Sequence, residues 1–389
     1  MNIYTRSFTQ KASILQRAFS SAEQSKHFPE FLGVYQKLFE KSKILEQILP
    51  RQIKDVEQLV QVFPGSVSAK SVKTKNVDIQ SINEGLLDPA YDLLNRGGKR
   101  WRPSLGLMIA EAYGRKIENF EENKDVYYIQ GLTELIHNGS LMIDDLEDNS
   151  LQRRGEPCTH IKYGPDYAVN AGNFMYYAPL LHINKFVNKN LRAKFYDVYV
   201  KELVNLHIGQ NWDIHWHHGK VQPNLQNYLD MVVNKTSVLP RINLQMLSLV
   251  LKLKRGDTLA LEKYLNGLGT AFQIQDDIIA LKSEEYIKTR GLGEDIREGK
   301  RSLMVIRTLS KNKKRNEKLT EILNKRDNTE EELAWATKLL KENGSIEYAD
   351  KIAKGIMEKS WKLVQVKIPE GPAKANLEKL SKFIIERQI

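Results

Sequence analysis

Two acidic clusters in this 389-residue chain each close a run of apolar residues. The first lies in IDDLEDNSLQRRG (143–155), in which four carboxylates are followed by two arginines. The second lies in FQIQDDIIA (272–280), which carries two adjacent aspartates. Crowded carboxylates can share divalent cations, and arginine side chains bind phosphate oxygens in a bidentate manner. The two clusters therefore predict one cavity in which metal ions meet a phosphorylated ligand.

The spacing of the first cluster suits metal binding. Asp144 and Asp148 are four residues apart, so on a helix both side chains project from one face. The apolar segment 129–143 before them is long enough to be a buried helix. Carboxylates at the C-terminal end of a helix oppose its dipole, and a bound cation would relieve that repulsion. Ligands that are all oxygen favour Mg²⁺, which binds carboxylates together with ligand phosphates.

The alternative interpretation is that each acidic pair is a solvated helix end. We consider it the weaker one, because both pairs follow apolar helical segments and both have basic residues nearby.

The elements that would position these clusters are helices. Apolar residues recur with a period of 3.6 in the segments 27–63, 127–143, 191–214, 226–253, 257–281, 330–342 and 373–387. The stretch 63–77 is rich in Ser and Lys and is interpreted as a linker or exposed loop. We find no alternating strand pattern and no internal repeat. The predicted fold class is therefore all-α, with one main domain and an N-terminal helical appendage.

The composition excludes several classes of protein. Hydrophobic residues make up 41% of the chain, which is enough for a substantial core. The net charge of +11 allows a diffuse attraction to anionic lipid, phosphorylated ligands or nucleic acid, but it identifies no partner, and we predict no nucleic-acid partner. The single cysteine, Cys158, excludes an internal disulfide and a cysteine-rich zinc site. No apolar run reaches about 18 residues, so no membrane-spanning helix is expected.

Residues 1–19 are predicted to be a mitochondrial presequence. They carry Arg6, Lys11 and Arg17, several hydroxyl residues and no acid, which is typical of an amphipathic targeting segment. The sequence RAFSS that starts at residue 17 also resembles a matrix-protease cleavage site. The alternative is the frayed, basic N-terminus of a cytosolic protein.

Six motifs resemble, in order, those of the trans-polyprenyl diphosphate synthases. They are GGKRWRP (97–103), LIHNGSLMIDDLEDNSLQRRG (135–155), GQNWDIHW (209–216), KT (235–236), FQIQDD (272–277) and GEDIREGK (293–300). The acidic motif is most similar to eukaryotic geranylgeranyl diphosphate synthases, and GGKRWRP is closer to longer-chain enzymes. The resemblance runs from about residue 84 to the C-terminus. It implies the isoprenoid synthase fold, a large antiparallel helical bundle around a central cavity, with a synthase domain at 81–389 and a helical extension and linker at 20–80.

The resemblance also implies a reaction and its residues. An allylic diphosphate is ionised, the double bond of isopentenyl diphosphate attacks the carbocation, and magnesium neutralises the departing pyrophosphate. The implied metal ligands are Asp144, Asp148, Asp276 and Asp277. Arg153 is expected at the allylic diphosphate, and Arg154 at isopentenyl diphosphate with Lys99, Arg102 and His137. The remaining substrate positions are matched by Lys235, Thr236, Gln273, Arg290 and Lys300, of which Lys235, Thr236 and Gln273 are the expected catalytic residues.

Product length is expected to depend on Gly139 and Ser140, the residues five and four before the first aspartate. In the family, bulky aromatic residues there stop elongation. A glycine should leave room, so we expect a product longer than farnesyl diphosphate, either geranylgeranyl diphosphate or a long quinone side chain such as that of ubiquinone. A mitochondrial address favours the quinone chain.

The sequence departs from the family pattern at three positions. Ala280 stands where many relatives have a third Asp, Arg290 stands where Lys is common, and Pro240 should kink a helix. These departures keep open a second possibility, that the chain is a non-catalytic or partner subunit in a mitochondrial assembly. A terpene cyclase is less favoured, because a cyclase needs no isopentenyl diphosphate pocket and the residues for one are present.

The expected partners follow from the family. A homodimer is the default, a heteromer with a related subunit is the alternative, and peripheral contact with a membrane is compatible with the basic surface. The histidines at 215, 217 and 218 could suggest a metal site, but we assign that segment to the structural GQxxDIxW motif and expect surface histidines.

Overall fold

The computed structural model describes residues 29–98, 100–283, 293–311, 313–325 and 327–386. The predicted presequence, Lys99 and Arg290 lie outside the described residues. The fold is all-α, as predicted, and its only described strands form one two-residue pair. None of the described helices is both long and apolar enough to cross a bilayer.

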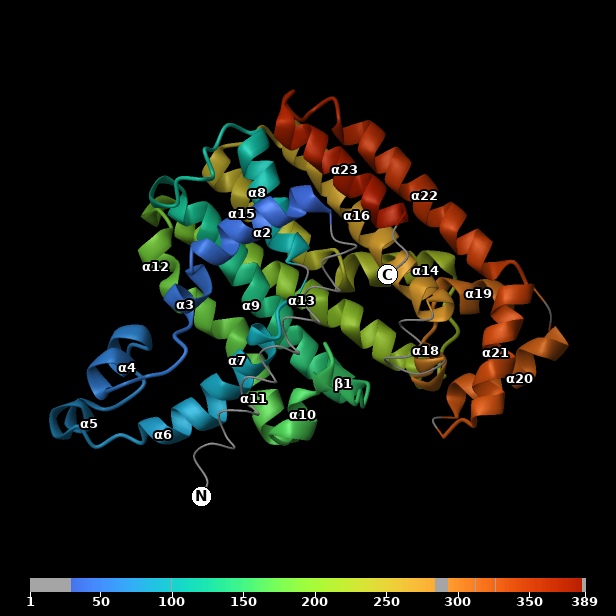
Figure 1. Cartoon of the computed structure of the whole chain (residues 1–389), viewed down its shortest axis with the longest axis horizontal. Coiled ribbons are helices and arrows are strands. Elements are labelled where there is room, and N and C mark those ends of the chain that lie inside the picture. The colour runs from blue at the N-terminus through green and yellow to red at the C-terminus, as the bar shows by residue number, and fades with distance from the viewer. Residues whose placement is uncertain (1–28, 99, 284–292, 312, 326, 387–389) are drawn as a thin grey trace, which may run out of the picture.

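The helices form a bundle around the long helix α9 (Figure 1). Before α9 come α2 (Glu30–Lys41), α3 (Ile44–Ile48), α4 (Val56–Val62), α5 (Ala69–Thr74), α6 (Ile79–Ile82), the π-helix η1 (Asn83–Leu87), α7 (Asp88–Asn95), α8 (Trp101–Ala112) and the 3₁₀ turn η2 (Glu121–Asn123). The central part contains α9 (Lys124–Glu147), β1 (Gln152–Arg153), β2 (Glu156–Pro157), α10 (Thr159–Lys162), α11 (Pro165–Tyr177), η3 (Ala178–His182), α12 (Ile183–Phe186), η4 (Lys189–Leu191) and α13 (Arg192–His217). The remainder is α14 (Leu225–Lys235), α15 (Val238–Leu251), α16 (Arg255–Lys282), α18 (Glu294–Arg297), α19 (Leu303–Leu309), α20 (Lys313–Asn324), α21 (Glu330–Glu342), α22 (Ser345–Val364) and α23 (Pro372–Glu386).

Helix α9 is the core of the bundle. Its residues 126–136 are all buried, and it packs against α8, α11 and α15. A helix that is buried on every side is expected at the centre of a large domain. Helix α16 packs against α15, α22 and α23, and α13 packs against α14 and α15. The bundle therefore brings the C-terminal ends of α9, α14 and α16, which carry predicted site residues, and of α13 within side-chain reach of one another.

The N-terminal helices are continuous with this core. Helix α2 packs on α8 and α3 packs on α9, with Phe39, Ile44 and Ile48 buried. Gly131 of α9 permits the approach of α3, because a Cβ at that position would lie 2.7 Å from Cδ1 of Ile48. The extension at 20–80, which the sequence suggested as a separate region, thus shares the hydrophobic core of the bundle in its described part.

Two predicted segments differ in detail from the structure. The segment 226–253 is two helices, α14 and α15, separated at Thr236 and Ser237. Pro240 lies in the first turn of α15, where its missing N–H costs no helical hydrogen bond, so it does not kink a helix. The predicted linker at 63–77 contains the short helix α5, whose side chains are all at least partly exposed.

A hairpin follows α9 that the periodicity did not predict. β1 and β2 pair antiparallel through a two-residue turn, Arg154 and Gly155, with φ of 56° and 77°. Positive φ at both central residues is the type I′ geometry that matches the twist of a hairpin. Arginine rarely adopts this conformation, so the turn fixes Arg154 in an unusual direction.

Candidate active site

The first acidic cluster lies where α9 ends. Oδ1 of Asp144 accepts a hydrogen bond from Nε2 of Gln210 on α13 at 2.9 Å and pairs with Nζ of Lys235 at 3.2 Å. Burial and the neighbouring charge of Asp144 raise the pKa of Asp148 to about 7. Two carboxylates that repel each other in this way would be stabilised by a cation between them. Their donors are carboxylate oxygens, so the pair fits Mg²⁺, which takes its other ligands from water and phosphate.

Lys235, the last residue of α14, links α9 to α13. Its ammonium lies 2.6 Å from Oδ2 of Asp213 and 3.2 Å from Oδ1 of Asp144. Burial opposes the charged form of Lys235, but Asp144 and Asp213 outweigh it and raise the pKa of the lysine. Gly209 on α13 permits this approach, because a Cβ there would lie 2.6 Å from the backbone nitrogen of Lys235. The lysine is therefore a permanent cation at the edge of the acidic cluster.

Asp213 and His217 were not among the predicted site residues. His217 is buried, with Nε2 3.1 Å from Oδ1 of Asp213 and Nδ1 3.9 Å from Oδ1 of Asp148. The expectation that this histidine lies on the surface is wrong. Burial opposes the charge of Asp213, but Lys235 and His217 hold its pKa well below the usual range. The i, i+4 spacing of Asp213 and His217 is the one signal for this contact that can be read before the structure.

The second cluster lies near the C-terminal end of α16. The carboxylate of Asp277 is buried, pairs with Nζ of Lys300 at 2.9 Å, and accepts hydrogen bonds from Tyr228 and Gln273, each at 3.0 Å. Three donors thus surround the Asp277 carboxylate, which pairs directly with Lys300, and the assignment of Asp277 as a metal ligand stays a prediction. Asp276, the neighbouring residue, is only partly buried.

A chain of contacts joins the two clusters. Thr236, next to Lys235, donates from Oγ1 to Oε1 of Gln273 at 2.9 Å, and Gln273 donates in turn to Asp277. The GEDIREGK segment (293–300) also lies near the first cluster. Burial raises the pKa of its Glu298, and the negative charges of Asp148 and Asp295 raise that pKa further. Among the described residues, no three His, Cys, Asp or Glu side chains converge on one metal position. Each cluster therefore offers a cation few protein ligands.

The hairpin supplies the first of the two arginines. Nε of Arg153 donates to Oδ1 of Asp145 at 2.8 Å, and Asp145 is only 1% exposed. Asp145 therefore orients Arg153, while Asp144 and Asp148 lie on a different face of the same helix. Within the acidic run 144–148, Asp145 thus holds a cationic side chain, whereas Asp144 and Asp148 are suited to hold metal ions.

Arg154 is packed into the glycine loop before α8. Its guanidinium donates to Gly97 O, to Leu93 O at 3.2 Å and to Oδ1 of Asn138 at 3.3 Å. Burial lowers its pKa to about 10. Gly98 is required here, because its φ is 132° and a Cβ would lie 3.0 Å from Nη2 of Arg154. The GGKRWRP and RRG motifs are therefore in direct contact.

Arg102 and His137 form a third pair. Nη1 of Arg102 lies 3.2 Å from Nε2 of His137, and its guanidinium carbon lies 4.6 Å from the centre of the Trp101 ring. Burial and then the charge of Arg102 hold the pKa of His137 well below its usual value of 6.5. A neutral imidazole can accept the hydrogen bond from the arginine. The pair lies beside Arg154, whose charge also lowers the pKa of His137.

Gly139, one of the two residues predicted to control product length, does not face open space as expected. A Cβ at Gly139 would lie 2.6 Å from the carbonyl oxygen of Gly172 on α11, so this glycine permits the close crossing of α9 and α11. The hydroxyl of Ser140 donates to His137 O at 2.8 Å. The expectation that Gly139 leaves room for a growing chain is therefore wrong, because α11 fills that room.

Tyr176 of α11 is the bulky side chain at this crossing. Its ring lies 3.4 Å from the position of a Cβ on Gly139, and its pKa is raised by burial and then by Glu147 and Asp144. The aromatic ring thus lies close to the acidic cluster. No feature of the sequence around Tyr176 indicated this, because the position depends on how two helices cross.

Comparison with known proteins gives a consistent result. Residues 83–340 match the sequence model of the family described as polyprenyl synthetase. The chain is 33% identical over 278 residues to a geranylgeranyl pyrophosphate synthase of Hypoxylon pulicicidum, which covers 72% of this chain and 68% of the relative. It is 32% identical over 279 residues to the geranylgeranyl pyrophosphate synthase of Dictyostelium discoideum, covering 72% of this chain and 87% of the relative.

Solved structures agree in fold. A geranylgeranyl pyrophosphate synthetase from Pyrococcus horikoshii superposes with a TM-score of 0.73 at 26% identity, covering 92% of this chain and all of the other. A polyprenyl synthase from Caulobacter crescentus, complexed with calcium and isoprenyl diphosphate, superposes with a TM-score of 0.74 at 20% identity, covering 92% and 97% of the two chains.

Proposed function

Because the chain belongs to the polyprenyl synthetase family and is therefore a prenyltransferase, we propose that it condenses isopentenyl diphosphate with an allylic diphosphate in a reaction that depends on Mg²⁺. The observation that carries this proposal is the chain of contacts from Asp144 through Lys235 and Thr236 to Gln273, which joins the two acidic clusters in one site. The arginine hairpin adjoins the same site at Asp145.

Each side chain has a role that follows from its contacts. Asp144, Asp148 and Asp276 would hold Mg²⁺, which supplies Lewis-acid neutralisation of the departing pyrophosphate. Lys235 adds a fixed cation beside the same leaving group, which needs no reorganisation during the reaction. Arg153 binds the allylic diphosphate in an orientation that Asp145 maintains.

Two neutral groups lie beside the cationic ones. The Thr236 hydroxyl and the Gln273 carbonyl are hydrogen bonded to each other, and Gln273 is in turn held by Asp277. Their oxygen lone pairs can stabilise a developing allylic carbocation without reacting with it. Arg154, Arg102 and the neutral His137 form the adjoining pocket that we assign to isopentenyl diphosphate. Lys99, Arg290 and Lys300 complete the proposed set of diphosphate contacts.

The function is tested by incubating the chain with farnesyl diphosphate, labelled isopentenyl diphosphate and Mg²⁺. We expect label in products extended by five-carbon units, with one pyrophosphate released per condensation. The Asp144→Ala variant should be inactive under the same conditions. A wild-type chain that gives no product alone but does so after a related subunit is added would favour the second candidate, a partner subunit.

That second candidate is favoured by one observation. Ala280, where many relatives carry a third Asp, is buried and offers no oxygen to a metal. The first Asp of the motif is present, so we place the active enzyme first. The distinction depends on turnover by the isolated chain.

We further propose geranylgeranyl diphosphate or a longer polyprenyl diphosphate as the product. Support comes from relatives that are described as geranylgeranyl pyrophosphate synthases. Mass analysis of the products from each allylic primer tests the proposal, and a product that stops at farnesyl diphosphate would contradict it.

An apolar stripe on α13 supports a homodimer. Val200, Val204 and Ile208 recur at a spacing of four and are 60%, 54% and 41% exposed. Tyr177 and Leu181, also exposed, extend the patch toward α11 and η3. Large exposed apolar patches of this kind mark interfaces. Light scattering should give twice the chain mass of 44.9 kDa, and Val204→Glu should give the monomer. A monomeric wild-type chain would point to a heteromer.

We propose mitochondrial localisation from residues 1–19 and their lack of acids. Import into isolated mitochondria followed by N-terminal sequencing tests it, with cleavage near residue 19 expected. The basic net charge also supports peripheral contact with anionic membranes, which vesicle sedimentation would detect.

A further inference from the structure

Two arginine side chains from other segments donate hydrogen bonds to backbone carbonyls in the last turn of α7. Nη2 of Arg100 donates to Leu94 O at 3.0 Å, and Nη1 of Arg154 donates to Leu93 O at 3.2 Å. Carbonyls at the end of a helix have no intrahelical partner and carry the negative end of its dipole. Cationic donors therefore stabilise this turn. One of them comes from the loop after α7 and the other from the hairpin.

The same turn also holds the hairpin directly. Nη1 of Arg96 donates to Arg153 O at 3.0 Å, and Nη2 donates to Pro157 O at 2.8 Å. Arg96 also pairs with Asp92 one turn earlier. The last turn of α7 thus contacts the loop that carries Arg100 and the hairpin backbone, and it directly accepts the guanidinium of Arg154.

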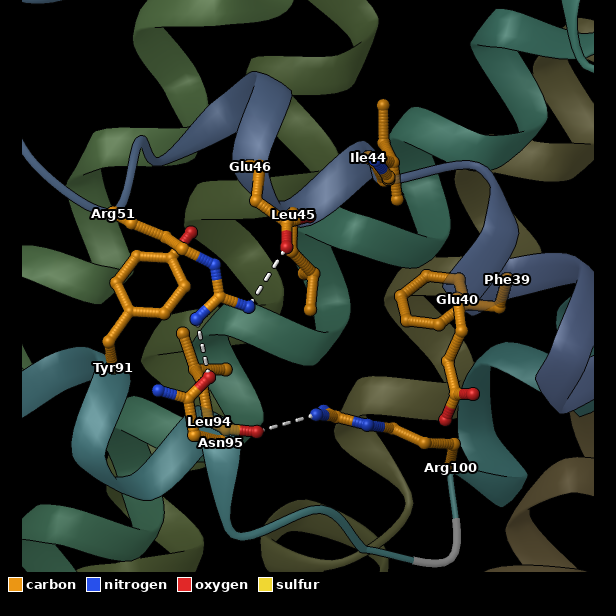
Figure 2. A pocket seen from close by; sticks show the side chains of 11 residues that line it. Phe39, Glu40, Ile44, Leu45, Glu46, Arg51, Tyr91, Leu94, Asn95 and Arg100 are labelled. Carbon is orange, nitrogen blue, oxygen red and sulfur yellow. Dashed lines mark hydrogen bonds and ion pairs between the residues drawn. The ribbon is translucent and has the colours of Figure 1, made fainter. Parts of the chain in front are cut away.

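The N-terminal segment contacts this turn through Arg51. Figure 2 shows the Arg51 side chain between Tyr91 and Asn95, beside a cavity of about 210 Å³ between α3 and α7. Nη1 of Arg51 donates to Oδ1 of Asn95 at 2.7 Å, and its guanidinium carbon lies 4.7 Å from the centre of the Tyr91 ring. The Tyr91 hydroxyl donates to Leu49 O. Each of the two segments, the one that contains Leu49 and Arg51, and helix α7, therefore donates a hydrogen bond to the other.

Asn83, the first residue of η1, binds the backbone of the N-terminal segment at Ile53. Its side chain accepts from Ile53 N at 2.8 Å and donates to Ile53 O at 2.9 Å. The segment 44–53 therefore contacts both ends of the helical stretch 83–95.

We propose that Arg51 is a positioning residue for isopentenyl diphosphate, acting through the last turn of α7 on the glycine loop and on Arg154. The inference rests on the proposed function. Arg51 lies outside residues 83–340, the region that matches the family. Its side chain is 55% exposed and that of its ion-pair partner Glu46 is 37% exposed, so the pair adds little to stability. Its guanidinium instead links the last turn of α7 to α3, because Nη1 donates to Asn95 and Nη2 donates to Glu46.

Steady-state kinetics of Arg51→Ala test the proposal. We expect KM for isopentenyl diphosphate to rise roughly five- to tenfold, since small misplacements of binding groups have effects of this size or larger. KM for the allylic diphosphate should change by less than about twofold, because Arg153 is held by Asp145. Lys54→Ala, which removes one positive charge from the same segment, is the matched control and should behave as wild type.

A second variant removes the Asn95 side of the hydrogen bond between Arg51 and Asn95. Asn95→Ala should raise KM for isopentenyl diphosphate in the same way, and the double variant should be no worse than the more affected single variant. Arg51→Lys should recover only part of the loss, because lysine has no planar fork.

The outcomes separate the two claims. A wild-type chain that makes no product, alone or with a related subunit, overturns the proposed function. An active wild-type chain with an unchanged KM in Arg51→Ala overturns the positioning role. Equal rises in both KM values, or a melting temperature that falls together with activity, would show a general structural role and overturn it as well.

Discussion

Asp213→Asn is the substitution whose effect depends most directly on the observed geometry. Asp213 is 3% exposed, and its carboxylate contacts Lys235 at 2.6 Å and His217 at 3.1 Å. Removing one partner of a buried ion pair costs roughly 3–5 kcal/mol when the other charge is left alone. Lys235 keeps Asp144 at 3.2 Å and its side chain is 24% exposed, so we expect a loss of about 2–3 kcal/mol in the free energy of unfolding.

The same substitution should affect metal binding. Without Asp213, the ammonium of Lys235 pairs with Asp144 alone and competes with a cation for that carboxylate. Losing a partner that orients a ligand group typically costs 10- to 100-fold in metal affinity. We therefore expect the Mg²⁺ concentration for half-maximal activity to rise about tenfold.

The measurements are a denaturant titration and a Mg²⁺ titration of turnover. Asp197→Asn, on the exposed surface of the same helix, is the matched control and should leave both quantities unchanged. If Asp213→Asn has the stability and the Mg²⁺ dependence of the wild type, the reasoning about Lys235 is refuted.

Three further predictions follow from close approaches. Gly98→Ala should raise KM for isopentenyl diphosphate at least tenfold in steady-state kinetics, because the new Cβ would lie 3.0 Å from Nη2 of Arg154 and φ is 132°; an unchanged KM would contradict the contact. Gly139→Ala should lower the free energy of unfolding by roughly 1–3 kcal/mol, because the Cβ would meet Gly172 O at 2.6 Å; a stable variant that makes a shorter product would instead restore the sequence-based view. Tyr176→Ala should lengthen the product in mass analysis, since it removes the ring beside the α9–α11 crossing, and an unchanged product distribution would exclude that role.

The helices and the acidic clusters were predictable because they depend on local periodicity. Asp144 and Asp148 share a helix face by spacing alone, and the apolar runs before both clusters are buried helices, as expected. The hairpin could not be predicted in the same way, since its strands have only two residues each and carry no alternating pattern. Its turn at Arg154 and Gly155 depends on a left-handed conformation that arginine rarely adopts.

Other features depend on contacts between distant segments. A glycine at position 139 predicts open space, because the sequence cannot show that Gly172 lies against it. His217 is expected on the surface because the sequence cannot show that Asp148, at the end of α9, lies 3.9 Å from its ring. The sequence makes Asp277 equivalent to Asp276, and the burial of Asp277 together with its contacts to Lys300, Tyr228 and Gln273 distinguishes the two. In each case the deciding quantity is the packing of elements far apart in the chain.

The most direct measurement compares turnover of the wild type, Asp144→Ala, Asp276→Ala and the double variant at saturating Mg²⁺. If both aspartates act on one metal-bound diphosphate, each single variant should lose more than about 100-fold in kcat/KM and the double variant should be little worse than either. Single variants that retain activity, or losses that simply multiply in the double variant, would contradict a single shared site.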